Sequence, residues 1–186
     1  MPNIAFSSVV HGCVSGGADD PLRTSADGTG TLLRQLVMAT GAESVVECGG
    51  AHVVPIAEAL RSNGRGRVVG CGAGADRVTR ASDALERAGL AAYGRMLPAG
   101  CGDARPEVPG PVDLLVLAGA PECFLPSLRQ WEPRILPGAM VVACGVREVP
   151  EGMTDFLAHV RAAGGDYLSL PLALDEGWLE LAVRSA

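Results

Sequence analysis

The chain has 186 residues, a formal net charge of −6 at pH 7 and 48% hydrophobic residues. This length is enough for one domain with a substantial core and short for two. No apolar run approaches the ~20 residues of a membrane-spanning helix, and the first residues lack the pattern of a secretory signal. The 15 basic residues are all arginines, scattered in ones and twos, which excludes the basic patch of a nucleic-acid-binding protein. We therefore expect a soluble, cytoplasmic protein.

A polar, glycine-rich lead-in over residues 1–28 precedes the first predicted helix, in which leucine and valine recur at helical spacing within residues 32–37. Residues 44–48 indicate a short buried strand that ends at a pair of glycines. The next helix has Pro55 in its first turn, where a missing N–H leaves no hydrogen bond unmade. The first third of the chain thus predicts helix, strand and helix.

The alternation of strand and helix then repeats. A strand over residues 67–71 is followed by a helix over residues 76–88, whose apolar residues lie on one face. A third strand over residues 93–99 is weakened by a glycine and a proline. Residues 112–117 are apolar nearly throughout, as expected of a strand that is buried on both sides.

The last third of the chain predicts a short helix over residues 127–131, a turn over residues 136–138, a strand over residues 140–143 and a helix around residues 153–160. Two extended runs then follow, joined by the polar segment 175–177, and this arrangement indicates a hairpin.

The two runs of the hairpin are residues 167–172 and 178–183. Strand–helix alternation that ends in such a hairpin predicts an α/β fold. We expect a doubly wound, mostly parallel, Rossmann-like sheet with an antiparallel C-terminal strand.

Five of the six cysteines are predicted at one edge of this sheet, at strand ends or in loops: Cys48, Cys71, Cys101, Cys123 and Cys144. Together with His52 they permit the interpretation of a soft-metal or thiol site. The alternative, which we favour, is that they are reduced thiols buried as small hydrophobic residues. No C-x-x-C spacing supports a metal, and nothing indicates a secreted, disulfide-bonded chain.

Six blocks of sequence carry a family resemblance: SADGTGTLLRQL, AESVVECGG, GRVVGCGAGADRVTRASDALERAGL, VDLLVLAGAPE, LPGAMVVACGV and DEGWLELAVRS. In order and spacing they resemble the small bacterial O-methyltransferases related to the caffeoyl-CoA and catechol enzymes. The resemblance runs from about Ser25 to Ala186 and implies a domain of the class I methyltransferase fold over residues 29–186. It also implies S-adenosylmethionine as cofactor, a small-molecule hydroxyl as acceptor, and a homodimer.

Carried over residue by residue, the resemblance predicts a cofactor site of Glu47, Gly49, Gly50, His52, Gly72 and Asp103. Two glycines of the family's motif are replaced by Ala51 and Val53, and a valine side chain is a steric objection where bare backbone faces the ligand. Gly72 stands where the family has an acidic residue that accepts hydrogen bonds from the ribose hydroxyls. Loss of that pairing is worth about 1.5–3 kcal/mol, or roughly ten- to a hundredfold in affinity. Asp103 matches the residue near the adenine.

Many members of this family hold a divalent metal with an aspartate and an Asp-Asn pair, and these positions correspond to Ala118, Cys144 and Gly145. They offer no oxygen ligand for a magnesium-type ion, so we expect no divalent metal. Three hypotheses stay open. The chain is a metal-independent O-methyltransferase, a homologue without methyl transfer that serves as a binding or dimerising partner, or an enzyme of different chemistry that uses Cys144 or His52.

Other conspicuous residues receive structural interpretations. His52 is interpreted as a histidine packed at the sheet edge, with a general base as the alternative. Residues 70–74 follow a strand and precede a helix, but they lack the lysine and the spacing of a nucleotide motif. Trp131 and Trp178 are expected to be core or interface anchors. We expect residues 77–86 to form a solvated helix face and His159 to be exposed.

Overall fold

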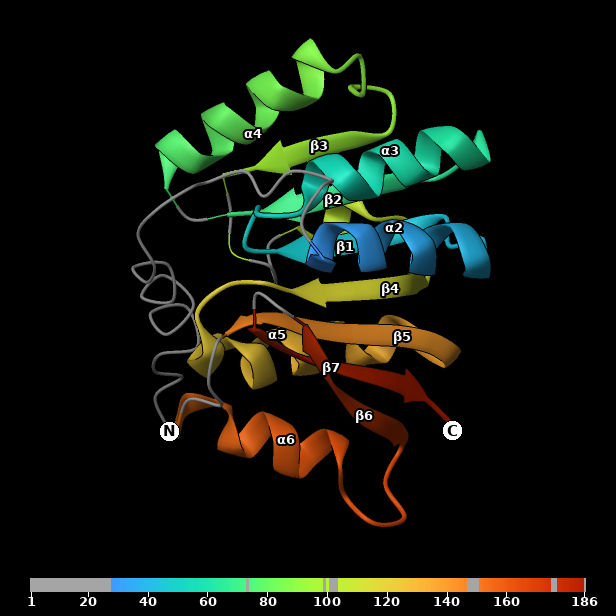
Figure 1. Ribbon diagram of the computed structural model, residues 1–186, viewed down its shortest axis with the longest axis vertical. Helices are drawn as coiled ribbons and strands as arrows, with labels where there is room; N and C mark the ends of the chain where they lie inside the picture. Colours follow the sequence, from blue (N-terminus) through green and yellow to red (C-terminus); the bar gives the residue numbers. More distant parts are fainter. Residues whose placement is uncertain are drawn as a thin grey trace.

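Seven strands form one sheet in the order β3-β2-β1-β4-β5-β7-β6 (Figure 1). The computed structural model describes residues 28–72, 74–98, 100, 104–146, 151–174 and 177–185. Neighbouring strands from β3 to β5 are parallel, whereas β7 runs antiparallel to both β5 and β6. The strands are β1 (Ser44–Cys48), β2 (Arg67–Cys71), β3 (Gly94–Leu97), β4 (Val112–Leu117), β5 (Ile135–Val146), β6 (Tyr167–Leu174) and β7 (Gly177–Arg184). The predicted doubly wound sheet with an antiparallel C-terminal strand is confirmed.

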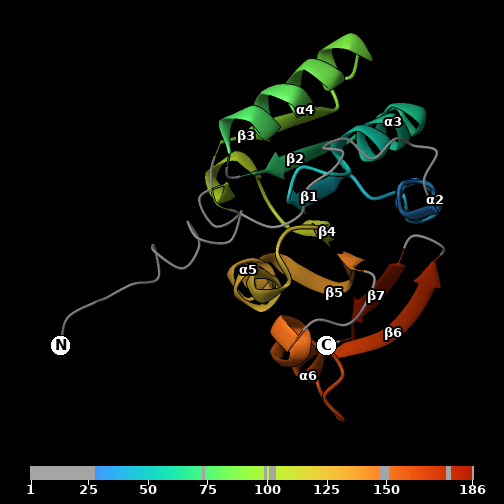
Figure 2. The same ribbon diagram turned by 60° about the vertical axis from the view of Figure 1, so that its left-hand side comes forward.

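Helices cover both faces of the sheet (Figure 2). On one face lie α2 (Gly28–Thr40), α3 (Val53–Asn63) and α4 (Ala75–Arg87), and on the other lie α5 (Phe124–Trp131) and α6 (Thr154–Val160). Short 3-10 turns are η1 (Arg105–Glu107), η2 (Pro121–Cys123), η3 (Glu132–Arg134) and η4 (Glu151–Met153). Within the described part of the chain, every helix is too short or too polar to cross a bilayer.

The apolar strand β4 lies between two core layers, because successive side chains of a strand point to opposite faces. Leu115 and Leu117 pack in the layer under α5 and α6, whereas Leu114 and Val116 pack in the layer under α2, α3 and α4. Trp131 is fully buried in the first of these layers, which confirms its interpretation as a core anchor.

One predicted turn is wrong. Residues 136–138 lie inside β5, which begins at Ile135, so the strand is longer than the predicted 140–143. The pairing register with β4 shifts between Val112 and Leu114. Gly138 takes a φ of 89° there, so Pro137 and Gly138 mark an irregularity in the strand where we predicted a turn.

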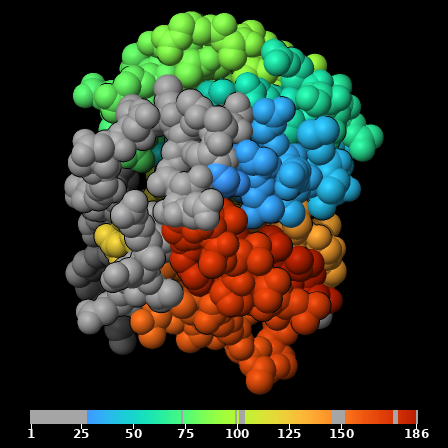
Figure 3. Space-filling model, in the orientation of Figure 1, coloured from blue at the N-terminus to red at the C-terminus, as the bar shows by residue number. Residues whose placement is uncertain are grey.

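The closing hairpin leaves part of one sheet face exposed. Leu168 and Leu170 of β6 are 70% and 56% exposed, and their register partners Val183 and Leu181 on β7 share the same face. In the space-filling view the surface of this hairpin, in red, borders α2, in blue (Figure 3). Pro171 interrupts the hydrogen-bonding capacity of this edge strand, which is a common protection against strand addition.

The strand order fixes where a ligand would bind. The chain moves outward from β1 to β2 and β3, and then returns to β4 on the other side of β1. In open α/β sheets, ligands bind beyond the carboxyl ends of the strands at such a reversal. The loops after β1, β2 and β4 therefore form the candidate site.

Candidate functional site

Glu47 organises the loop between β1 and α3. Its side chain is fully buried, and its carboxylate accepts hydrogen bonds from the backbone N–H groups of Gly50, at 2.6 Å, and Ala51, at 3.0 Å. The N–H of His52 also bonds to this carboxylate. N–H groups at a helix N-terminus have no partner within the helix and favour a negative charge. Glu47 thus satisfies the backbone donors that precede α3.

The ionisation of Glu47 is strongly perturbed. Burial raises the pKa of its carboxyl from 4.5 to about 7, against the opposing effect of the three backbone N–H groups and of the nearby Arg77 guanidinium. Removal of a carboxylate from water disfavours its charged form, and here this cost outweighs the hydrogen bonds. The carboxyl is therefore partly protonated near neutral pH.

The two glycines of this loop are required by its geometry. Gly49 has a φ of 136°, and a Cβ atom there would lie 2.7 Å from both the carbonyl carbon and the carbonyl oxygen of Ala118, in the loop after β4. Gly50 has a φ of 79°, and a Cβ atom there would lie 2.8 Å from Cε of Met96. Bare backbone lets the loops after β1 and β4 approach each other closely.

Arg77, the third residue of α4, spans the distance between that helix and the loop after β1. Its Nη1 donates a hydrogen bond of 2.9 Å to the carbonyl oxygen of Gly49. Its methylene carbons lie 3.5 Å and 3.9 Å from where Cβ atoms would stand on Gly50 and Gly72. The predicted solvated face is therefore wrong at this residue, because Arg77 is half-buried across the carboxyl ends of β1 and β2.

Met96 fills the space beside Arg77. It shares a row across the sheet with Glu47 and Gly70, and a Cβ atom on Gly70 would overlap its Sδ. Its Cε lies 3.4 Å from where a Cβ would stand on Gly72. Because Gly70 has no side chain, the Met96 thioether extends over β2 toward the loop after β1.

Five of the six predicted site residues are brought together around this loop: Glu47, Gly49, Gly50, His52 and Gly72. Asp103 lies outside the described residues and stays a prediction. His52 occupies the N-cap position of α3 and is 1% exposed, in agreement with a histidine packed at the sheet edge. Val53 is fully buried with Cγ2 above Gly70, so its side chain lies in the core, away from the position that the steric objection assumed.

Sequence reasoning missed both Arg77 and Met96. Arg77 could have been noticed, because it is a cation five residues after Gly72, at the start of the following helix. Met96 gave no signal, because its role depends on the absence of a side chain at Gly70 in the neighbouring strand.

The cysteines do not form one cluster. Cys48 and Cys71 are register partners on the face that packs against α5, whereas Cys144 faces the α2 side of the sheet. Cys71 and Cys144 are reduced and buried, but Cys48 and Cys123 are disulfide-bonded. The prediction of reduced thiols is therefore wrong at these two, because sequence spacing does not reveal which cysteines meet in space. In the described ranges, no three metal-ligating side chains gather.

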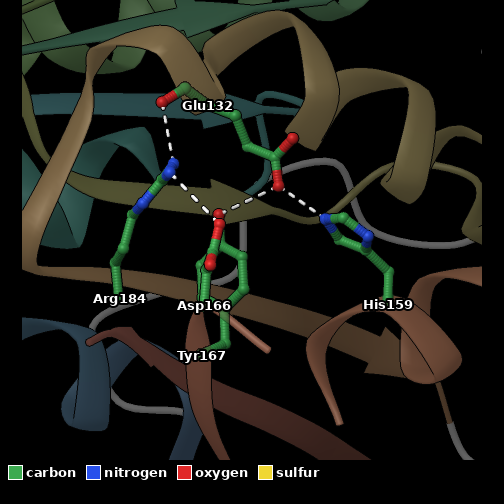
Figure 4. Close-up of polar contacts among 5 residues, drawn as sticks. All are labelled: Glu132, His159, Asp166, Tyr167 and Arg184. Atoms are coloured by element: carbon green, nitrogen blue, oxygen red, sulfur yellow. Dashed lines mark hydrogen bonds and ion pairs between the residues drawn. The ribbon is translucent and has the colours of Figure 1, made fainter. Parts of the chain in front are cut away.

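A second polar cluster lies at the opposite end of the sheet and joins η3, α6, β6 and β7 (Figure 4). Nε2 of His159 is 2.5 Å from Oε1 of Glu132, which also accepts a 3.2 Å hydrogen bond from the Tyr167 hydroxyl. Arg184 donates to the Glu132 carbonyl at 3.0 Å and pairs with Asp166 at 3.4 Å. Burial and the Glu132 carboxylate raise the pKa of Tyr167. The predicted exposure of His159 is wrong, since this cluster holds it half-buried.

Comparison with known proteins identifies the fold. No protein-family model matches the chain, and no curated protein sequence matches it. Solved structures do match. A methyltransferase from Geobacter sulfurreducens is 20% identical with a TM-score of 0.71, over 89% of this chain and 81% of that one. TomG of Streptomyces achromogenes, an O-methyltransferase solved with S-adenosylmethionine, is 20% identical with a TM-score of 0.70, over 85% and 80% of the two chains.

An O-methyltransferase of Bacillus cereus, solved with S-adenosylhomocysteine, is 18% identical with a TM-score of 0.70, over 95% of this chain and 86% of that one. At these identities the likeness is one of fold. It agrees with the resemblance carried by the sequence blocks and with the observed strand order. The chain has the class I methyltransferase fold of the O-methyltransferases.

Proposed function

We propose that this protein is an O-methyltransferase-like ligand-binding protein that does not transfer methyl groups from S-adenosylmethionine. The observation that carries this proposal is the hydrogen bond from Arg77 to the carbonyl of Gly49. Ligands of open α/β sheets bind beyond the ends of these strands. In this chain the half-buried guanidinium of Arg77 extends across that position, from α4 to the loop after β1.

The residues present do not fit S-adenosylmethionine. The cofactor carries a sulfonium, an ammonium and a carboxylate group, and a guanidinium at the same edge disfavours its net positive charge. Gly72 supplies no carboxylate to the ribose hydroxyls. The Glu47 carboxylate is taken up by backbone N–H groups and is partly protonated at neutral pH. Each of these features lowers the affinity for the cofactor.

The side chains at the implied metal positions also do not fit a divalent ion of the kind that catechol O-methyltransferases use. Ala118 has no ligand atom, and Cys144 is 1% exposed and faces the α2 side of the core. Magnesium-type ions prefer oxygen ligands, which neither residue supplies. We therefore expect any reaction at this edge of the sheet to proceed without the divalent metal that the family resemblance implies.

A second candidate is a metal-independent O-methyltransferase that acts on a small-molecule hydroxyl. The loop after β1 favours it, because Glu47, Gly49 and Gly50 keep a tight turn at the ligand edge of the sheet. TomG and the Bacillus cereus enzyme were solved with S-adenosylmethionine and S-adenosylhomocysteine, respectively. This candidate requires the Arg77 side chain to move away from Gly49 when the cofactor binds.

Calorimetric titration of the full chain with S-adenosylmethionine and S-adenosylhomocysteine tests the proposal. We expect no heat of binding for either ligand at ~1 mM, a concentration at which any complex tighter than about −4 kcal/mol is detected. Low-micromolar binding of either ligand would overturn the proposal and support the second candidate. A screen of hydroxyl acceptors for methyl transfer would then follow.

A further inference from the structure

The charged side chain near the end of β2 is an arginine, where the family resemblance implies a carboxylate. At this point, where the family resemblance implies an acidic residue, Gly72 presents only backbone. The nearest charged side chain is Arg77, whose Cδ lies 3.9 Å from where the Cβ of Gly72 would stand. The end of β2 therefore offers a ribose the permanent positive charge of Arg77 in place of a carboxylate that would accept hydrogen bonds from its two hydroxyls.

Arg77 also differs from the paired arginines of the chain. Arg65, Arg95 and Arg161, for example, form ion pairs with carboxylates. Among the described residues no carboxylate lies within ion-pairing distance of Arg77, and the one hydrogen bond of its side chain goes to a backbone carbonyl. A guanidinium has five N–H donors in a planar fork, so donors remain for an anion. Asp76, its neighbour in the first turn of α4, is exposed and does not pair with it.

In Rossmann-like sheets, the residues after the second strand distinguish between two kinds of ribose. An acidic residue binds the free hydroxyls, whereas an arginine nearby accommodates a phosphate on the ribose. Gly72 and Arg77 match the second arrangement. Resting on the proposed function, in which S-adenosylmethionine is not the ligand, we propose that this site binds an adenosine whose ribose carries a phosphate at the 2′ or 3′ position.

The loop after β1 limits the rest of the ligand. In dinucleotide-binding proteins the N–H groups at the first helix N-terminus bind the pyrophosphate. Here the N–H groups of Gly50, Ala51 and His52 bind the Glu47 carboxylate. Because these three N–H groups already bind Glu47, they cannot donate to a pyrophosphate at this place. The affinity must therefore come from the ribose phosphate at Arg77.

The test compares ligands that differ only in that phosphate. The full chain is titrated with adenosine 5′-monophosphate, adenosine 2′,5′-bisphosphate and adenosine 3′,5′-bisphosphate, with inorganic phosphate as the anion control. Each titration is repeated with Arg77→Gln and with Arg80→Gln. Arg80 is exposed one turn further along α4, so its loss changes the net charge of the helix equally. The two variants separate a local contact from a general electrostatic effect.

We expect one bisphosphate to bind at least ~10-fold more tightly than the monophosphate, since a charge-assisted guanidinium–phosphate pair is strong. Arg77→Gln should abolish this preference and Arg80→Gln should keep it. Preference for the 2′ or the 3′ isomer identifies which ribose position is recognised. Equal affinities, no binding of any nucleotide, or a preference that survives Arg77→Gln would overturn the inference. Binding of S-adenosylhomocysteine in a parallel titration would instead contradict the proposed function, so the two failures are distinguishable.

Discussion

Nη1 of Arg77 lies 2.9 Å from the carbonyl oxygen of Gly49, 28 residues earlier in the chain. This bond joins the start of α4 to the loop after β1 at the edge where ligands of this fold bind. The Glu47 carboxylate also holds this loop by accepting a hydrogen bond from the N–H of Gly50, and Gly49 lies close to the backbone of the loop after β4. Three contacts thus hold the loop after β1 in place, and each of them can be tested separately.

Glu47 makes stability depend on pH. Its pKa is about 7 in the folded protein and 4.5 in the unfolded chain. Between these values the folded state holds a proton that the unfolded state has released, so the free energy of unfolding falls as the pH rises from about 4.5 to about 7. Glu47→Gln cannot titrate and should lose this component. Urea unfolding of both proteins at several pH values measures the difference, and parallel curves would contradict the prediction.

Gly49→Ala should strongly destabilise the protein. The added Cβ would lie 2.7 Å from the backbone of Ala118, at a φ of 136° that other residues rarely adopt. We expect a loss of about 2–4 kcal/mol. The control is Gly64→Ala, at a φ of 73° with nothing within 4 Å of the new Cβ, where backbone strain alone predicts about 1 kcal/mol. Equal losses in chemical denaturation would show that the approach of the two loops is unimportant.

Arg161, with 41% of its side chain exposed, pairs with a glutamate that lies in the interior, Glu180. Nε and Nη2 of Arg161 donate to the two carboxylate oxygens of Glu180 at 2.7 Å and 2.6 Å, and the glutamate side chain is completely buried. Arg161→Ala leaves that carboxylate without its cation and should cost about 2–4 kcal/mol.

The control for Arg161 is Arg65→Ala. Arg65 pairs with Glu43 in the open, with 60% and 55% of the side chains exposed, and its loss should cost about 0–1 kcal/mol. The midpoints of urea unfolding compare the two variants. If Arg161→Ala unfolds at the same midpoint as Arg65→Ala, the Glu180 pair does not stabilise the hairpin.

The sequence predicted the parts of the fold that depend on local patterns. Apolar strands alternate with amphipathic helices, and this alternation determines a doubly wound sheet with few alternatives. The strand that ends at Gly49 and Gly50 was also found from its local pattern, whereas Glu47, Gly49 and Gly50 were proposed as site residues from the family resemblance. The turn assigned to residues 136–138 failed because proline and glycine also occur at irregularities within strands.

The contacts that carry the proposed function are not local. Arg77 belongs to a helix of mixed charges, and its reach to Gly49 depends on the separation of β1 and β2 in space. The disulfide bonds of Cys48 and Cys123 likewise depend on how the loops are brought together. The role of Asp103 near an adenine remains a prediction, because that residue lies outside the described part of the chain.

The most direct test of the account is a titration of S-adenosylhomocysteine into the wild type and the double variant Gly72→Asp/Arg77→Ala. A Cβ at Gly72 has only ordinary contacts, the nearest at 3.4 Å from Cε of Met96, and Arg77→Ala removes the side chain next to it. We expect no binding to the wild type at ~1 mM and at least ~10-fold stronger binding to the double variant, because a ribose acceptor is restored and a cation removed. Low-micromolar binding to the wild type, unchanged or weakened in the double variant, would contradict it.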